Sequence, residues 1–117
     1  MPTMGALESK FADIIWEREP LPSGQLVKLA AAALSWKPTT SYTVLKRLCE
    51  RGIFVNNNGV VSSLISRDDF YAIQCENFVD ETFSGSLPAF VAAFGKRKKL
   101  SDAEVERLKA LIEQMRS

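Results

Sequence analysis

The chain has 117 residues, a formal net charge of +1, 46% hydrophobic residues and 25% charged residues. This balance is typical of a folded protein, and the small net charge argues neither for nor against a nucleic-acid partner. No apolar run approaches the roughly 20 residues that span a bilayer. The N-terminus also lacks the apolar core of a signal peptide. We therefore expect no membrane insertion and a cytoplasmic location.

The residue types limit the chemistry that the chain can perform. It has two cysteines, Cys49 and Cys75, and no histidine. A zinc site of Cys and His ligands therefore lacks ligands, and Ser–His and Cys–His catalytic pairs are impossible within one chain. The two cysteines are expected to be buried free thiols. We expect no catalytic residues, no metal, no cofactor and no enzymatic activity.

Three helices are predicted in the first part of the chain. Residues 6–18 carry apolar side chains at the spacing of one helix face. After a proline-rich break, Ser23 can cap a second helix at about 24–34. The stretch "WKPTTSYTVLKRLCERG", residues 36–52, predicts a third helix, because a proline suits its first turn and a glycine suits its end.

A β-hairpin is predicted directly after the third helix. "IFV" at 53–55 and "VVSSLIS" at 60–66 are the expected strands. Between them, Asn58-Gly59 is the favoured dipeptide for a tight turn with positive backbone φ angles. Three helices followed by a hairpin are the element order of a winged helix-turn-helix domain, which we assign to residues 1–67.

Residues 68–117 are predicted to form a helical dimerisation region. Helices are expected at about 68–83, in "SLPAFVAAF" and in the last segment, which opens with a capping box of Ser101 and Glu104. Three short helices can hardly bury their apolar side chains alone, so we expect a homodimer. The alternative is that these helices fold back onto the first domain. Phe70 is one of the apolar residues of this segment, and the predicted dimerisation residues are Phe78, Phe83, Leu87, Phe90, Phe94, Leu108 and Ile112.

The polar side of the third helix is the candidate DNA-binding surface. Val44, Leu45 and Leu48 cluster on the core side of a helical wheel. In helix-turn-helix proteins, the later helix enters the major groove and its N-terminal side chains meet base edges. A solvated helix face without a partner is the alternative interpretation. The candidate DNA-binding residues are Thr39, Thr40, Tyr42, Thr43, Lys46 and Arg47.

The order and spacing of several short motifs resemble the BlaI/MecI/CopY family of bacterial repressors. The first half contributes "IIW" at 14–16, Trp36 four residues before Thr40, and Thr43, Arg47, Leu48 and Gly52 in sequence. The second half contributes Phe83, Gly85, Leu87, Phe94 and "LSDAEVERLKALIEQ". The resemblance covers nearly the whole chain.

The resemblance implies a mainly α fold with a small β-hairpin, namely a winged helix-turn-helix domain and a helical dimerisation region. It also implies a homodimeric repressor of the penicillinase repressor type that binds a palindromic operator in double-stranded DNA. In the members that control β-lactam resistance, a membrane sensor metalloprotease triggers cleavage in the dimerisation region.

The sequence departs from the family pattern in four places, the first of which is Lys37, where a serine helix cap is common. The hairpin has no cation between Arg51 and Arg67, and the family's Asn-Phe cleavage pair corresponds here to Ala93-Phe94. The C-terminal segment lacks the cysteine pairs of the copper-sensing branch.

The basic loop at 96–99 is expected to be solvated, or alternatively to contact phosphate. A winged-helix module that binds protein instead of DNA is the rival function.

Overall fold

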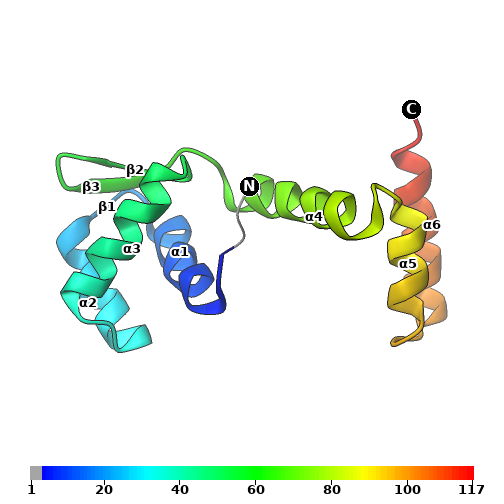
Figure 1. Cartoon of the computed structure of the whole chain (residues 1–117), viewed down its shortest axis with the longest axis horizontal. Helices are drawn as coiled ribbons and strands as arrows, with labels where there is room; N and C mark the ends of the chain where they lie inside the picture. Colours follow the sequence, from blue (N-terminus) through cyan, green and yellow to red (C-terminus); the bar gives the residue numbers. More distant parts are fainter. Residues whose placement is uncertain (1–3) are drawn as a thin grey trace. The chain divides into compact units, whose positions relative to one another are not determined.

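The computed structural model describes residues 4–117, which contain six helices and three short strands (Figure 1). The order of helices and hairpin confirms the predicted fold class. Contacts divide the chain into two compact units, one up to Cys75 and one from Glu76 onward, and each is described by itself. The helices are α1 (Ala6–Arg18), α2 (Ser23–Leu34), α3 (Pro38–Glu50), α4 (Arg67–Phe83), α5 (Leu87–Gly95) and α6 (Asp102–Gln114). The strands are β1 (Leu21–Pro22), β2 (Phe54–Asn57) and β3 (Val60–Ser63).

The first unit has one hydrophobic core, to which α1, α2 and α3 each contribute an apolar face (Figure 1). The helical period of 3.6 residues places these side chains on one side of each helix. The strands add side chains that close the core from the hairpin side. The largest fully buried side chains are Phe11, Ile15, Leu26, Leu48, Ile53, Phe54, Val61 and Phe70.

A short turn joins α2 to α3 and fixes the direction of α3. Ser35 ends α2 in the left-handed conformation, with φ 58°, and its backbone N–H donates to the Ala31 carbonyl at 3.1 Å. The ring of Trp36 packs on Phe11 with centroids 5.2 Å apart, so Trp36 is partly buried against the core. Pro38 then occupies the first turn of α3, as predicted.

The predicted cap of α2 is wrong. Ser23 is the first helical residue, the capping position is Pro22, and no side chain caps the helix. The backbone N–H of Ser23 donates instead to the Gly59 carbonyl at 2.7 Å. The start of α2 is therefore fixed by the hairpin turn rather than by a serine hydroxyl.

The hairpin turn forms as predicted, although the strand bounds differ. Asn58 and Gly59 have φ values of 52° and 88°, the positive pair that a tight hairpin turn requires. The Asn56 side-chain oxygen accepts a hydrogen bond from the Gly59 N–H at 2.9 Å. The strand β2 begins one residue and ends two residues later than predicted, whereas β3 begins at Val60 as predicted and ends at Ser63, where its pairing with Phe54 ends.

The strand β1 was not predicted, because two residues with a proline carry no periodic signal. It pairs with β3 through Leu21↔Val61, so β3 lies between β1 and β2. The Glu19 carboxylate accepts hydrogen bonds from the backbone N–H and the hydroxyl of Ser63, each at 2.8 Å. These bonds hold the segment after α1 beside the hairpin.

The first turns of α4 belong to the first unit. Phe70 is 1% exposed, and Trp16 packs between it and Phe54 with ring centroids 5.8 and 5.1 Å away. The Arg67 Nε donates to Asp13 at 2.9 Å. Phe70 is therefore part of the core of the first unit and adds nothing to the apolar surface of the second. The compact unit extends beyond residue 67, while the functional division at that residue stays a prediction.

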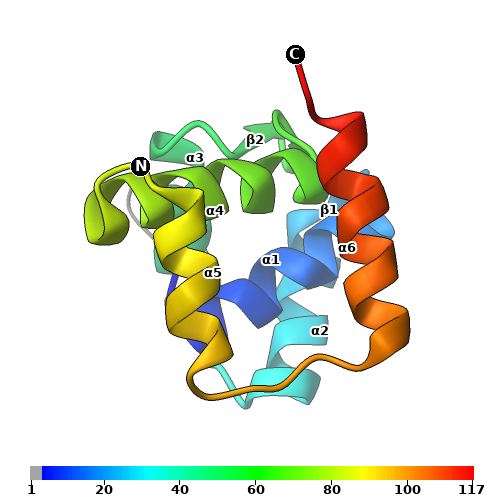
Figure 2. The same cartoon turned by 90° about the vertical axis from the view of Figure 1, so that its right-hand side faces the viewer.

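The second unit consists of the end of α4 with α5 and α6, which run in opposite directions (Figure 2). Ser101 and Glu104 form the predicted capping box at the start of α6. The Ser86 hydroxyl caps α5 by accepting from the Ala89 N–H at 3.1 Å. Among the described residues, neither α5 nor α6 has a single buried side chain. The unit is therefore stabilised locally but leaves its apolar faces uncovered.

Candidate nucleic-acid interface

The two faces of α3 divide as the sequence predicts. Val44, Leu45 and Leu48 are buried, together with Ser41. The opposite face is polar and solvent-exposed, and its role in DNA binding stays a prediction. The exposed side chains there include all six candidates, Thr39, Thr40, Tyr42, Thr43, Lys46 and Arg47.

Thr43 offers a partner mainly an acceptor and a methyl group. Its hydroxyl donates to the Thr39 carbonyl one turn earlier, at 2.8 Å. The hydroxyl oxygen keeps lone pairs that can accept from a base amino group, and the methyl can contact a thymine methyl. Thr40 and Tyr42 flank it on the exposed side. This part of α3 presents short polar and apolar groups of the kind that can contact base edges.

The two cations on this face have different surroundings. Lys46 is exposed and forms no ion pair with any residue from 4 to 117. Arg47 forms an ion pair with Glu8 in the first turn of α1, and the Arg47 Nη1 and Glu8 Oε1 atoms are 3.4 Å apart. Glu8 also lies 3.7 Å from Arg51 at the end of α3. The sequence does not predict this contact, because nothing in helical spacing links residues 39 positions apart.

The hairpin tip offers amides instead of charges. Asn56 is committed to the turn, whereas Asn57 and Asn58 are exposed. Arg67, the next cation along the chain, is paired with Asp13 and lies 5.0 Å from the Tyr71 ring centroid. The hydrogen bond with Asp13 also raises the pKa of Arg67. Contacts of this tip to phosphate would therefore come from amide and backbone N–H groups.

The predicted dimerisation residues form an apolar surface on the second unit. Phe78 and Phe83 pack edge-to-face with Phe90 and with each other, at centroid distances of 5.7 to 6.1 Å. Phe83 and Phe90 are half-buried in this cluster. The remaining members of the predicted set are exposed, namely Phe78, Leu87, Phe94, Leu108 and Ile112.

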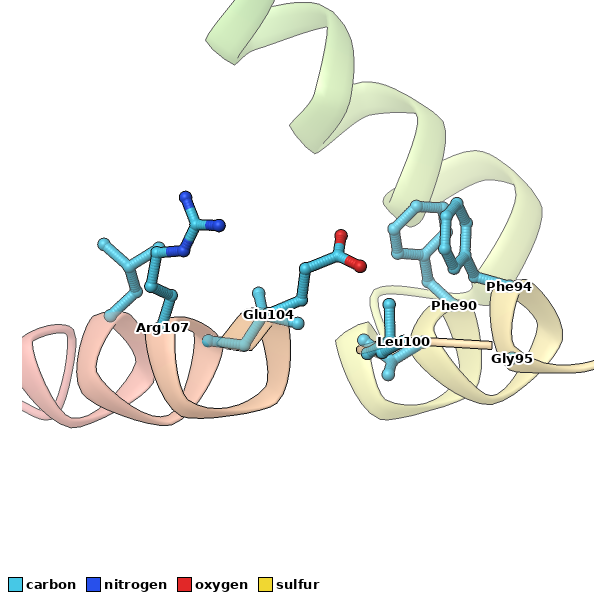
Figure 3. A pocket seen from close by; sticks show the side chains of 9 residues that line it. Phe90, Phe94, Gly95, Leu100, Glu104 and Arg107 are labelled. Atoms are coloured by element: carbon cyan, nitrogen blue, oxygen red, sulfur yellow. The ribbon is translucent and has the colours of Figure 1, made fainter. Parts of the chain in front are cut away.

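A cavity of about 530 Å³ lies between α5 and α6. Phe90 and Phe94 from α5 and Glu104 and Arg107 from α6 project to the same side of the two helices (Figure 3). The lining is completed by Val91 and Gly95 on α5, Leu100 in the connecting loop, and Leu108 and Leu111 on α6. This hollow is apolar and is flanked by the charged side chains of Glu104 and Arg107. Such a surface suits the complementary face of another protein chain.

The candidate cleavage pair Ala93-Phe94 lies within α5. Ala93 is half-buried and Phe94 is exposed. Their carbonyls accept hydrogen bonds from the N–H groups of Lys96 and Arg97, at 3.2 and 3.1 Å. A protease that needs an extended substrate would therefore have to unwind the last turn of α5.

The two cysteines differ in burial. Cys49 is half-buried, and burial raises the pKa of its thiol. Cys75 is exposed, so the expectation that both thiols are buried was wrong for this residue.

Residues 4–117 contain no group of three or more side chains that could hold a metal ion. No helix in the same range is long and apolar enough to cross a membrane.

Comparison with known families decides the relationship. The family model described as penicillinase repressor matches residues 4–114. The chain belongs to this family. The match confirms the resemblance found from the sequence motifs, and it includes both units of the structure.

Individual members of the penicillinase repressor family are distant from this chain. The penicillinase repressor of Bacillus licheniformis is 22% identical over 118 aligned positions, covering 97% of this chain and 92% of that protein. The methicillin resistance regulatory protein MecI of Staphylococcus aureus is 23% identical over 113 positions, covering 93% and 92%. Both alignments run through the DNA-binding and dimerisation regions that the sequence predicts.

A solved structure of a family member shares the fold. The solution structure of the monomeric form of Bacillus licheniformis BlaI, in complex with the blaP half-operator, superposes with a TM-score of 0.50. The match covers 58% of this chain and 88% of that one, with 22% sequence identity. At this identity the likeness concerns the fold alone.

Proposed function

We propose that this chain is a homodimeric transcriptional repressor that binds a palindromic operator in double-stranded DNA through α3. The observation that carries the proposal is the exposed polar face of α3, in a chain that belongs to the penicillinase repressor family. Promoter occlusion is the mechanism. In this account the protein is not an enzyme and needs no cofactor.

Each α3 would enter a major groove, where different side chains would contact base edges and backbone phosphates. Thr40 and Thr43 lie in the N-terminal half of the helix, where side chains of a recognition helix reach base edges. Lys46 and Arg47 lie one turn later and would neutralise phosphate charge. The proposal thus assigns sequence choice to the hydroxyl-bearing residues and much of the affinity to the cations.

The second unit would join two copies of the chain. In such a dimer the two recognition helices would bind half-sites about one DNA turn apart, roughly 34 Å, as in other helix-turn-helix dimers. The exposed apolar residues of α5 and α6 support this role, because a partner chain would remove them from water. Symmetric pairing also explains why a palindromic site suits the protein.

Release from DNA would follow proteolysis within the second unit, with a membrane sensor metalloprotease as the proposed partner. The corresponding bond is Ala93-Phe94, which is helical here. Cleavage would separate the C-terminal α6 from α5 and weaken the dimer. A half-site held by one α3 binds less tightly than two half-sites held together.

The experiment that tests DNA binding compares two double variants of equal charge change. Lys46→Ala with Arg47→Ala removes both cations of the exposed face, whereas Lys96→Ala with Arg97→Ala removes two cations from the loop after α5. Fluorescence anisotropy with a labelled operator duplex measures the dissociation constant of each. We expect a loss of about 100-fold or more for the first variant, since each charged contact contributes about 1–3 kcal/mol. Equal losses for both variants would contradict recognition by α3.

One observation favours a second candidate function, a winged-helix module that binds protein. The hairpin tip carries amides and no cation between Asn56 and Ser66. In that case the partner's binding would depend mainly on apolar residues such as Val60 and Leu64, which are exposed on the hairpin and after it. The same pair of variants separates the two functions, because protein binding would survive loss of Lys46 and Arg47.

A further inference from the structure

A carboxylate from α1 lies against the cationic end of α3. Glu8 occupies the first turn of α1, 39 residues before its partner Arg47. Glu8 Oε1 is 3.4 Å from Arg47 Nη1, and Glu8 Oε2 is 3.7 Å from Arg51 Nη1. One carboxylate therefore lies between two guanidinium groups, and the three side chains together carry a single positive charge.

The three side chains differ in their access to solvent. Side-chain exposure is 21% for Glu8, 24% for Arg51 and 47% for Arg47. The Glu8 Oε2 and Arg51 Nη1 atoms are both buried without a hydrogen-bond partner among residues 4–117, so they face each other in an enclosed position. Arg51 therefore anchors the inner oxygen of the carboxylate. The outer oxygen is directed at Arg47, on the face that we assign to DNA.

This arrangement has two effects on Arg47. The carboxylate offsets the guanidinium charge, which weakens the attraction of Arg47 for any phosphate that approaches. The contact also restrains a long side chain, so less rotamer freedom is lost when Arg47 binds in a fixed geometry. The first effect weakens binding to all DNA, whereas the second favours the one geometry that a correct site offers.

We propose that Glu8 is a specificity-determining residue for DNA binding, which acts through Arg47. It lowers the affinity for non-operator DNA, where Arg47 would neutralise whichever phosphate it meets. On the operator, the lost attraction is offset by the preset position of Arg47. This inference rests on the proposed function, because it concerns the discrimination between operator and other DNA.

The test compares Glu8→Gln with Glu17→Gln. Both variants remove one negative charge from α1, but Glu17 is exposed and forms no ion pair with residues 4–117. The probes are a duplex that wild-type protein enriches from a random pool and the same duplex with its sequence scrambled. Dissociation constants are measured across a range of salt concentrations, and thermal unfolding followed by circular dichroism verifies that each variant folds.

We expect Glu8→Gln to tighten binding to scrambled DNA by about three- to tenfold, with a logarithmic salt slope steeper by about 0.9, the value for one additional phosphate contact. Binding to the enriched duplex should change less than about twofold, so the specificity ratio falls by roughly three- to tenfold. Glu17→Gln should leave that ratio within about twofold of wild type. In an Arg47→Ala background, Glu8→Gln should no longer change the ratio.

Three results would overturn the inference, and only the first of them would also overturn the proposed function. If wild-type protein enriches no sequence from the pool, the proposed function fails and the inference fails with it. If wild-type protein discriminates but Glu8→Gln leaves the ratio unchanged, the inference alone fails. A fall in the ratio that persists in the Arg47→Ala background would show that Glu8 does not act through Arg47.

Discussion

Individual side chains of α3 are divided between the protein core and the exposed face. Val44, Leu45 and Leu48 hold the helix in the core, and the helical period alone predicts their burial. The same period predicts which polar side chains face solvent. It cannot predict that Glu8 pairs with Arg47, because that contact depends on how α1 packs on α3.

Leu48 should carry a large share of the stability of the first unit. It is fully buried in α3, so Leu48→Ala removes apolar contacts and leaves a cavity. We expect the free energy of unfolding to fall by about 2–5 kcal/mol. Urea denaturation followed by circular dichroism measures this change. Thr40→Ala, on the exposed face of the same helix, should change it by less than about 0.5 kcal/mol, and equal effects would contradict the assigned faces.

The two thiols should differ in reactivity. Cys75 is exposed, whereas Cys49 is half-buried and burial raises its pKa, so less of it is thiolate at a given pH. We expect iodoacetamide at pH 8 to modify Cys75 first, as measured by mass spectrometry of the intact protein and its peptides. Because the pKa of Cys49 is higher in the folded state than in the unfolded state, where it is about 8.5, its neutral thiol contributes to stability below that unfolded-state pKa. This contribution is lost as pH rises through the folded-state pKa. Faster modification of Cys49 would contradict the assigned environments.

Whole elements were predictable where a local signal specifies them. The Asn58-Gly59 turn and the Ser101–Glu104 capping box form as expected, because both depend on residues adjacent in sequence. The strand β1 was missed because it exists only through pairing with β3. The burial of Phe70 in the first unit could not be predicted, because its helix continues into the second unit and only the packing against Trp16 shows it.

The capping box should determine how firmly α6 begins. Ser101→Ala removes the hydroxyl that accepts from the Glu104 N–H at 3.2 Å. We expect a loss of about 1 kcal/mol in the free energy of unfolding, measured by urea denaturation at fixed protein concentration. Glu104→Gln keeps the reciprocal hydrogen bond and should cost less than half as much as Ser101→Ala. The reverse order of the two effects would contradict the capping geometry.

The molecule as a whole exposes its apolar surface unevenly. The first unit encloses a core of large side chains, whereas α5 and α6 have no buried residue within the described part of the chain. The apolar pattern in the sequence predicts this surface, because three short helices cannot cover it.

Dimerisation through α6 gives a direct prediction. Ile112 is 58% exposed, so Ile112→Glu should leave the fold of a single chain intact. A dimer interface would have to bury that unpaired charge, at a cost of several kcal/mol. We expect sedimentation velocity to show a dimer for wild type and a monomer for the variant at micromolar concentration. Val60→Glu, on the hairpin, is the control and should remain dimeric, and a dimeric Ile112→Glu protein would place the interface elsewhere.

Sequence-specific repression requires selective DNA binding, which a gel shift on DNA from upstream of the protein's own gene measures. The assay is run at two salt concentrations in the presence of competitor DNA. We expect a dimer–DNA complex that resists the competitor and weakens steeply as salt rises, because binding neutralises several phosphates. Binding no stronger than to the competitor, even at low salt, would contradict the repressor function and favour the protein-binding module.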